Sequence, residues 1–291
     1  MPRRSWRKFD TFRPVSDGAQ APRGAAGQAD PVLRRVADSL RDKGLRGTVE
    51  RAAARAALTR DTLRAAWRMK RDGRRVRSIP ESLDFIFGFE VGRVGLRPIQ
   101  VTSEIEGLLE LLQADPPRSV LEIGTAQGGT LFLLSRVAAV DAELLTVDLP
   151  GGPFGSGYQS DWLPLLKAMP LPGQRFKAVR GDSHDPGTRD QVAEWFGDRA
   201  VDFALIDGDH RYEGVRRDFE LYGSLVRPGG WIAFHDIVPG DEEMVGGVPR
   251  FWQELKERMP VTRELVDDWE QGGWGLGLCQ VPEEGIQPGI F

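Results

Sequence analysis

Two short motifs carry side chains that could act together in catalysis. Asp207-Gly-Asp-His210 follows the apolar run 201–206, and His235-Asp236 follows the apolar run 231–234. Both runs predict buried strands, and in an open parallel sheet the chemistry collects at the carboxyl ends of the strands. We therefore expect Asp207 and Asp236 to point into one crevice, where their oxygens suit a hard cation such as Mg²⁺. His210 adds a group that accepts a proton near neutral pH.

A glycine-rich segment upstream predicts a cofactor-binding loop. The apolar run 119–123 leads into Gly124-Thr-Ala-Gln-Gly128, where glycine allows a tight turn and the close approach of a ligand. Asp148 ends the next apolar run and is placed to accept hydrogen bonds from both hydroxyls of a ribose. Ala126 replaces the second glycine of a dinucleotide-binding loop, which leaves room for a cofactor without phosphates. A plain strand–turn–helix junction is the alternative for this loop.

Several of these polar residues also have an ordinary structural interpretation. Gly181-Asp182-Ser183 ends a third apolar run, so Asp182 either lies near the adenine of a bound nucleoside or caps a turn. Asp207 could cap the following helix, and His210 could have a packing role. For His235 we favour the interpretation that it orients Asp236.

The order of predicted elements indicates an α/β fold. From about residue 99, strands and helices alternate, which is typical of a doubly wound, Rossmann-like sheet. We predict three parts: a basic tail (1–30), a helical N-terminal extension (31–98) and the main domain (99–291). Within the extension we expect Gly44, Gly47 and Gly73 to separate two or three helices, and Ile79-Pro80 to end the helical segment.

Composition and charge restrict the class of protein. The chain has 291 residues, 40% of them hydrophobic, which is enough for a sizeable core. No apolar run reaches the ~18 residues of a membrane span, and no apolar stretch of a secretory signal follows the basic start. The single cysteine, Cys279, excludes an internal disulfide, and we expect a cytoplasmic location.

The net charge of −4 conceals a strong asymmetry. Residues 1–80 contain 21 Lys+Arg against 8 Asp+Glu, or +13, and the remainder contains 18 against 35, or −17. The simplest interpretation is that the two parts attract each other or that the basic helices are solvated. A contact with acidic lipid, nucleic acid or an anionic substrate is the alternative.

The order of the motifs resembles the class I S-adenosylmethionine-dependent methyltransferases. The sequence is similar to the branch that holds the macrocin- and mycinamicin-type sugar O-methyltransferases and the cephalosporin-hydroxylase-like proteins. The resemblance covers roughly residues 99–280 and is most specific in 203–214 and 225–236. It implies a seven-stranded methyltransferase sheet, S-adenosyl-L-methionine as cofactor and Mg²⁺ as the metal.

The resemblance also implies roles for individual residues. His210 becomes the general base, and Asp207 and Asp236 become the metal ligands, with His235 as a further candidate ligand. An acidic residue precedes the strand-end Asp236 in the sugar O-methyltransferases, whereas this chain has His235 there, so two carboxylates with more water, or no metal, are the alternatives. The expected cofactor-binding residues are Glu122, Gly124, Thr125, Gly128, Asp148, Asp182 and Ser183.

The expected reaction is methyl transfer to a hydroxyl of a small molecule, such as a natural-product sugar. We predict a lid at 239–249 over the acceptor, and Phe154, Tyr158 and Trp162 as its opposite wall. The alternatives are a nicotinamide-dependent oxidoreductase and a non-catalytic binding or scaffold protein of the same fold. We do not expect nucleic acid as a partner, and the N-terminal helices are able to mediate a homo-oligomer.

Overall fold

The chain divides into two compact units, residues 1–52 and 53–291, and the computed structural model describes residues 31–151 and 157–286. The described part of the first unit belongs to α1 (Pro31–Arg71), whose C-terminal part lies in the second unit. The predicted tail (1–30) lies outside the described residues, and the division into 31–98 and 99–291 stays a prediction. The predicted helix breaks at Gly44 and Gly47 are wrong: α1 runs through both, since a glycine costs a helix only about 1 kcal/mol.

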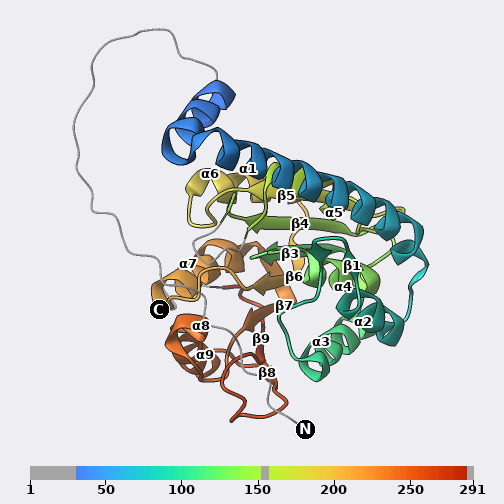
Figure 1. The fold of residues 1–291 in the computed structure, drawn as a ribbon. Coiled ribbons are helices and arrows are strands. Elements are labelled where there is room, and N and C mark those ends of the chain that lie inside the picture. Colours follow the sequence, from blue (N-terminus) through green and yellow to red (C-terminus); the bar gives the residue numbers. More distant parts are fainter. Residues whose placement is uncertain (1–30, 152–156, 287–291) are drawn as a thin grey trace, which may run out of the picture. The chain divides into compact units, whose positions relative to one another are not determined.

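A seven-stranded sheet forms the centre of the second unit, as expected for a doubly wound α/β fold (Figure 1). Its strand order is β5-β4-β3-β6-β7-β9-β8, and β9 runs antiparallel to both of its neighbours while the other pairings are parallel. The strands are β3 (Ser119–Ile123), β4 (Glu143–Asp148), β5 (Arg175–Arg180), β6 (Val201–Ile206), β7 (Val226–His235), β8 (Thr262–Leu265) and β9 (Leu276–Gln280). The order reverses at β3 and β6, so the strand ends there form the crevice in which ligands of such sheets bind.

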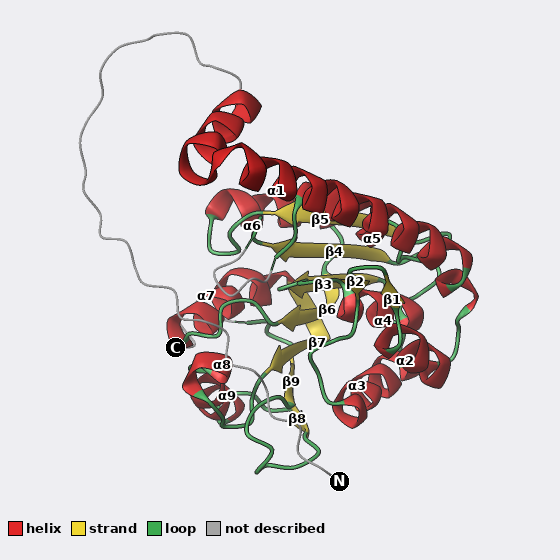
Figure 2. Cartoon of the chain, viewed as in Figure 1, coloured by secondary structure: helices red, strands yellow, loops and turns green. Residues whose placement is uncertain are grey.

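Helices cover both faces of the sheet (Figure 2). The apolar side chains of the strands alternate between the two faces. Val120 of β3 lies in one apolar core, whereas its neighbour Leu121 lies in the other, as the period of two in a strand requires. One core includes α2 (Ile79–Phe87), α3 (Thr102–Ala114), α4 (Gly129–Val137) and α5 (Leu163–Leu166). The other includes α6 (Pro186–Phe196), α7 (Tyr212–Tyr222) and α9 (Val248–Lys256).

Some local elements differ from the sequence prediction. Ile79-Pro80 begins α2 rather than ending a helical segment, because Ser78 and Glu81 form a reciprocal capping box and proline is favoured in the first turn. The β1 (Glu90–Val91) and β2 (Val94–Gly95) hairpin and the short α8 (Glu242–Val245) were not predicted. The described residues also form the 3₁₀ turns η1 (Gly73–Arg75), η2 (Ser160–Trp162) and η3 (Gly223–Leu225). None of the described helices is both long enough and apolar enough to cross a membrane.

Candidate active site

Backbone hydrogen bonds continue past the strand ends and align the predicted site residues along one edge of the sheet. Gly124 donates to the Val147 carbonyl at 2.9 Å, and Asp207 donates to the Ile123 carbonyl at 2.8 Å. Gly181 donates to the Asp148 carbonyl at 3.0 Å. The glycine loop, the ends of β4 and β5 and the acidic motif after β6 therefore lie next to one another.

The glycine loop packs directly against the acidic motif. Gly124 has a φ of +88°, and a Cβ there would lie 1.9 Å from the Asp207 carbonyl oxygen. Gly128 has a φ of +90°, and a Cβ there would lie 2.5 Å from Leu166. The sequence argument assigned these glycines to the approach of a ligand, whereas the structure shows that contacts within the protein already require them.

The loop holds Asp148 in place with backbone donors. The Ala126 N–H donates to Asp148 Oδ2 at 2.6 Å, and the Leu149 N–H donates to Oδ1 at 2.7 Å. Burial raises the pKa of Asp148 above its ordinary value, although these N–H groups oppose the shift. Each carboxylate oxygen keeps a second lone pair, so Asp148 can still accept hydrogen bonds from ribose hydroxyls.

Buried polar atoms without partners surround this loop. The two oxygens of Glu122 and the hydroxyls of Thr125 and Tyr158 are buried and make no hydrogen bond of ordinary geometry to the residues the structure describes. Burial, followed by the charges of Asp207 and Asp148, raises the pKa of Glu122 well above its ordinary value. Buried polar groups are normally satisfied, so this cluster has the character of a site that a polar ligand completes.

The segment after β5 already uses its polar groups in contacts within the protein. Asp182 is exposed, and its Oδ1 accepts a hydrogen bond from the His184 N–H at 2.9 Å, which is the turn-capping role that the sequence allowed. Ser183 offers its carbonyl to the Tyr222 hydroxyl at 2.7 Å. The cofactor roles of Asp182 and Ser183 stay predictions. Phe154 lies outside the described residues, Tyr158 is buried, and Trp162 donates from its indole N–H to the Gln127 carbonyl at 3.1 Å.

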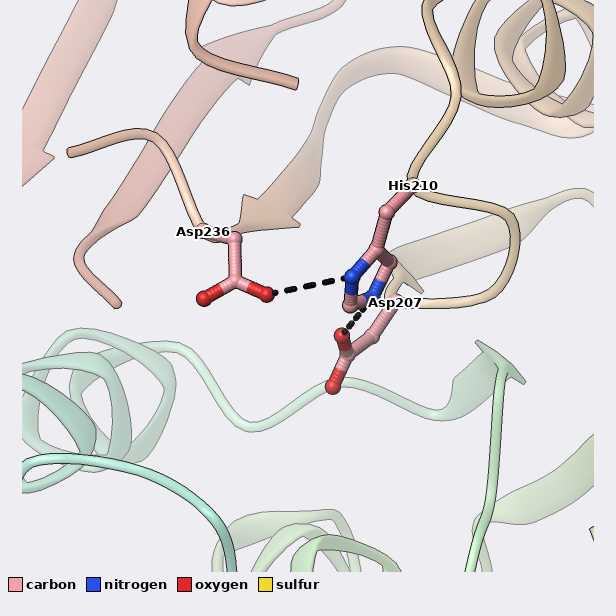
Figure 3. Close-up of side chains that lie close together, drawn as sticks. All are labelled: Asp207, His210 and Asp236. Carbon is pink, nitrogen blue, oxygen red and sulfur yellow. Dashed lines mark ion pairs between the residues drawn. The ribbon is translucent and has the colours of Figure 1, made fainter. Parts of the chain in front are cut away.

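The ends of β6 and β7 bring Asp207, His210 and Asp236 together (Figure 3). One ligand atom from each side chain lies within 4.8 Å of the other two. His210 Nε2 is 3.4 Å from Asp207 Oδ1, and His210 Nδ1 is 3.4 Å from Asp236 Oδ2. The structure thus brings the two predicted carboxylates together, with the imidazole between them.

Asp236 has an unusual backbone conformation that a tertiary contact holds. Its φ is +63°, a region where an aspartate occurs more readily than most side chains. The Trp274 N–H, on the segment before β9, donates to Asp236 Oδ1 at 3.0 Å. This leaves Oδ2 facing the imidazole, so the strained turn aims the carboxylate into the crevice.

The segment after β7 orients His210. The Met244 carbonyl, in α8, lies 2.6 Å from His210 Nδ1, and the Gly247 N–H donates to the His210 carbonyl at 2.7 Å. A carbonyl accepts only, so Nδ1 carries a proton and Nε2 is the nitrogen free to accept one when the ring is neutral. The segment 239–249 that we predicted as a lid is therefore docked against His210, and its opening stays a prediction.

His235 lies behind the two carboxylates. Its Nδ1 is 3.2 Å from Asp207 Oδ1 and 3.5 Å from Asp236 Oδ2, and the side chain is only 4% exposed. Burial alone would lower the pKa of His235, but attraction to Asp207 and Asp236 outweighs burial and raises this pKa well above its ordinary value. The geometry is that of a charge partner for both carboxylates, and the role of His235 as a metal ligand stays a prediction.

The charges of the neighbouring carboxylates and imidazoles also shift the pKa values of His210 and Asp207. Burial would lower the pKa of His210, but its hydrogen bond to Asp207 and the two carboxylate charges raise it to about 9. Burial would raise the pKa of Asp207, but the charge of His235 and the hydrogen bonds of His210 and His235 lower it below the ordinary range. Two imidazoles thus neutralise two carboxylates in this crevice.

Comparison with known proteins agrees with this geometry. Residues 121–237 match the sequence profile of a family described as Methyltransferase domain, and this segment contains both the glycine loop and the Asp207–His210–Asp236 group. Residues 121–237 form a methyltransferase domain. The match confirms the predicted methyltransferase, and the seven-stranded sheet agrees with the predicted fold.

The methyltransferase domain also has curated relatives. An uncharacterized protein of Sinorhizobium fredii is 28% identical over 153 residues, which are 52% of this chain and 16% of that protein. An uncharacterized protein of Acanthamoeba polyphaga mimivirus is 27% identical over 169 residues, which are 58% of this chain and 67% of that protein. The chain therefore spans only about a sixth of the first of these relatives.

Solved structures similar to this chain include several O-methyltransferases. The enzyme from Bacillus cereus in complex with SAH is 19% identical with a TM-score of 0.46, over 69% of this chain and 90% of that one. TomG from Streptomyces achromogenes, in complex with SAM, is 18% identical with a TM-score of 0.44, over 70% of this chain and 89% of that one. MycE, in complex with Mg and SAH, is 16% identical with a TM-score of 0.46, over 73% of this chain and 58% of that one.

Sequence reasoning missed two backbone groups of the methyltransferase domain's crevice. The Met244 carbonyl orients His210, and the Trp274 N–H orients Asp236. Every residue except proline offers both backbone groups, so the identities of Met244 and Trp274 give no signal for these contacts. The positive φ of Asp236 likewise follows from the turn after β7 and has no sequence marker.

Proposed function

We propose that this chain is an S-adenosylmethionine-dependent O-methyltransferase that acts on a hydroxyl of a small molecule, with assistance from a divalent cation. One observation carries the proposal: the glycine loop directly abuts the group that contains a proton acceptor. A Cβ at Gly124 would lie 1.9 Å from the Asp207 carbonyl, and His210 follows Asp207 by three residues. A methyl donor at the loop and an acceptor beside His210 would therefore be neighbours.

The unpartnered atoms around the loop support S-adenosylmethionine as the ligand. The cofactor brings two ribose hydroxyls, an amino group, a carboxylate and an electron-poor sulfonium methyl group. Asp148 suits the ribose hydroxyls, and Glu122 offers a buried negative charge to the cationic end of the cofactor. Gly124, Thr125 and Gly128 would shape the loop around it, and Asp182 and Ser183 would lie toward the adenine.

His210 is the proposed general base. The acceptor oxygen forms a bond to the methyl carbon as the bond from sulfur to that carbon breaks, and the hydroxyl proton passes to His210 Nε2. The Met244 carbonyl favours a proton on Nδ1, which leaves Nε2, 3.4 Å from Asp207 Oδ1, to take the hydroxyl proton when the ring is neutral. Such proton acceptors typically accelerate a reaction about 10²–10⁴-fold.

The donor set of the crevice fits a divalent cation. Asp207 and Asp236 supply carboxylate oxygens, which Mg²⁺ prefers, and His210 lies within reach of both. A cation held by the two carboxylates would polarise the acceptor hydroxyl and lower its pKa. By opposing the carboxylate charges it would also lower the pKa of His210 from about 9 toward the range of a working base.

The first experiment is calorimetric titration of the purified chain with S-adenosylhomocysteine, in Mg²⁺ and in EDTA. Micromolar binding supports the cofactor assignment and justifies screening hydroxylated acceptors with isotopically labelled S-adenosylmethionine, beginning with natural-product sugars. If S-adenosylhomocysteine binds in neither buffer and NAD(H) binds instead, the oxidoreductase alternative replaces the proposal.

The cation is tested with Asp236→Asn. Asparagine tolerates a positive φ and can still accept the Trp274 N–H, so the turn should survive while the charge is lost. We expect the dependence of methyl transfer on Mg²⁺ to disappear, with S-adenosylhomocysteine affinity unchanged. The matched control is Asp209→Asn, because Asp209 is paired with Arg211 outside the crevice. Equal Mg²⁺ dependence in Asp236→Asn and the wild type would refute the cation site.

A further inference from the structure

The outer face of α1 within the second unit combines cations with exposed apolar side chains. The exposed residues between positions 53 and 71 include five cations and neither Asp nor Glu; the cations are Arg55, Arg60, Arg64, Lys70 and Arg71. Leu63 and Trp67, one turn apart, are 54% and 60% exposed. Residues three and four apart share one helix face, so cations and apolar groups are interleaved on the same surface.

The opposite face of this helix is fixed in the core. Ala65, Ala66 and Met69 are buried in the same apolar core as α3 and α4. Rotating α1 to hide Leu63 and Trp67 would therefore expose these three side chains. The exposure of Leu63 and Trp67 follows from the fold itself.

A groove of about 510 Å³ adjoins this face. Leu63, Ala66 and Trp67 line one wall from α1, and Leu163 and Pro164 line the other from α5, which lies beside α1 in Figure 1. One lysine stands on each wall, Lys70 on α1 and Lys167 after α5. Neither lysine has an ion-pair partner among the residues that the structure describes.

Three of the neighbouring cations form local contacts, and one of them is Arg55, whose Nε lies 3.9 Å from Asp161 Oδ2. Arg71 makes a two-pronged contact with Asp72 and stacks over the Trp67 ring at 4.3 Å. Arg64 is 3.7 Å from Asp61. Arg60, Lys70 and Lys167 therefore carry most of the free positive charge, and they surround the exposed leucine and tryptophan.

We propose that this face of α1, together with the groove, docks on an anionic phospholipid surface. A helix face with interleaved cations, leucine and tryptophan is the composition that lies in the headgroup region of a bilayer, with the apolar groups inserted and the cations at the phosphates. A nucleic-acid surface would offer no apolar layer for Leu63. A second copy of this chain, whose residues 81–291 carry a net charge of −17, is the competing occupant and is an outcome of the test.

Separate variants test how the cations and the apolar side chains contribute to vesicle binding. The full chain is sedimented with vesicles of phosphatidylcholine alone and with vesicles that also contain phosphatidylglycerol. We expect binding to the anionic vesicles only, weakening as salt rises. Lys70→Gln and Lys167→Gln should each weaken binding about fivefold, with Arg199→Gln as the control at an exposed cation outside this face.

The apolar part is tested by the double substitution Leu63→Ser with Trp67→Ser. We expect loss of vesicle binding, whereas Trp269→Ser, at another exposed tryptophan, should bind as the wild type does. Circular dichroism and urea unfolding report that each variant is folded, so this test does not depend on the proposed cofactor or reaction. Equal binding to both vesicle types, or to neither, overturns the proposal. So does tighter binding to duplex DNA, or a dimer that Leu63→Ser with Trp67→Ser dissociates.

Discussion

The two halves of the crevice treat their buried charges in opposite ways. At the ends of β6 and β7, Asp207 and Asp236 are paired with His210 and His235 within 3.5 Å. At the ends of β3 and β4, the carboxylate of Glu122 is buried without a cationic or hydrogen-bonding partner among the described residues. The carboxylates of the first half have cationic partners within the protein, although His235 Nε2 there is buried without a hydrogen-bond partner among the described residues. In the other half the buried carboxylate of Glu122 itself has no such partner.

This difference predicts which half of the site should stabilise the fold when a ligand binds. A buried polar group without a partner costs about 1–3 kcal/mol, and more when it is charged. A cofactor that satisfies Glu122 and Asp148 should therefore stabilise the fold through the loop side. Substitution of a residue on the paired side should change the activity of the protein far more than its free energy of unfolding.

The largest expected effect is on the paired side, in His210→Ala. Removal of the proposed base should lower kcat about 10²–10⁴-fold. S-adenosylhomocysteine affinity should not change, because His210 lies on the acceptor side of the crevice. Turnover with labelled S-adenosylmethionine and calorimetry measure the two quantities. A variant that loses affinity but keeps its turnover would reverse the assignment of the two halves.

The second prediction concerns the unpaired side. Glu122→Gln replaces a buried carboxylate with a neutral group of the same shape and should raise the free energy of unfolding at pH 8 by about 1–3 kcal/mol. Cofactor affinity should fall roughly tenfold, because a charge-assisted contact is lost. Urea unfolding and calorimetry measure these changes.

The matched control is Glu143→Gln, since Glu143 is also buried in the sheet but is paired with Arg175. This variant should not gain stability. If Glu122→Gln is destabilised like the control, Glu122 has a partner in solution and the contrast between the two halves fails.

The third prediction concerns how the stabilising effect of Glu122→Gln depends on pH. The pKa of Glu122 is raised in the folded state, so the folded state binds its proton more tightly than the unfolded state does. The stabilisation that comes from binding this proton is therefore complete below the ordinary glutamate pKa of about 4.3. It is lost as the pH rises toward the pKa that Glu122 has in the folded state. The difference in unfolding free energy between Glu122→Gln and the wild type should be near zero in acid and grow with pH. A difference that does not depend on pH would contradict the unpaired charge.

The smallest effect tests the loop backbone. Ala126 has a φ of +46°, which is costly for a residue with a Cβ. Ala126→Gly should raise the free energy of unfolding by about 1 kcal/mol, with the contact from its N–H to Asp148 retained. Ala142→Gly, at a buried alanine without a positive φ, should lose stability and serves as the control.

Local sequence information was sufficient for most of the fold. Continuous apolar runs predicted β3, β6 and their neighbours closely, because a parallel strand that is covered on both faces has apolar side chains at most of its positions. The resemblance supplied the class of domain, and the family match confirmed it. The continuous α1 was not predicted, since the tolerance of Gly44 and Gly47 depends on the helix around them.

The set of strand-end groups could be predicted without any structure. Asp148, Asp207, His210 and Asp236 each follow an apolar run, and parallel strands bring such ends to one edge. The tertiary structure alone decided how the groups are paired. His235 became the charge partner of Asp207 because β6 and β7 are in register at Ile206 and Phe234. Met244 and Trp274 orient His210 and Asp236 through backbone atoms, which every sequence offers and only the packing of distant segments can select.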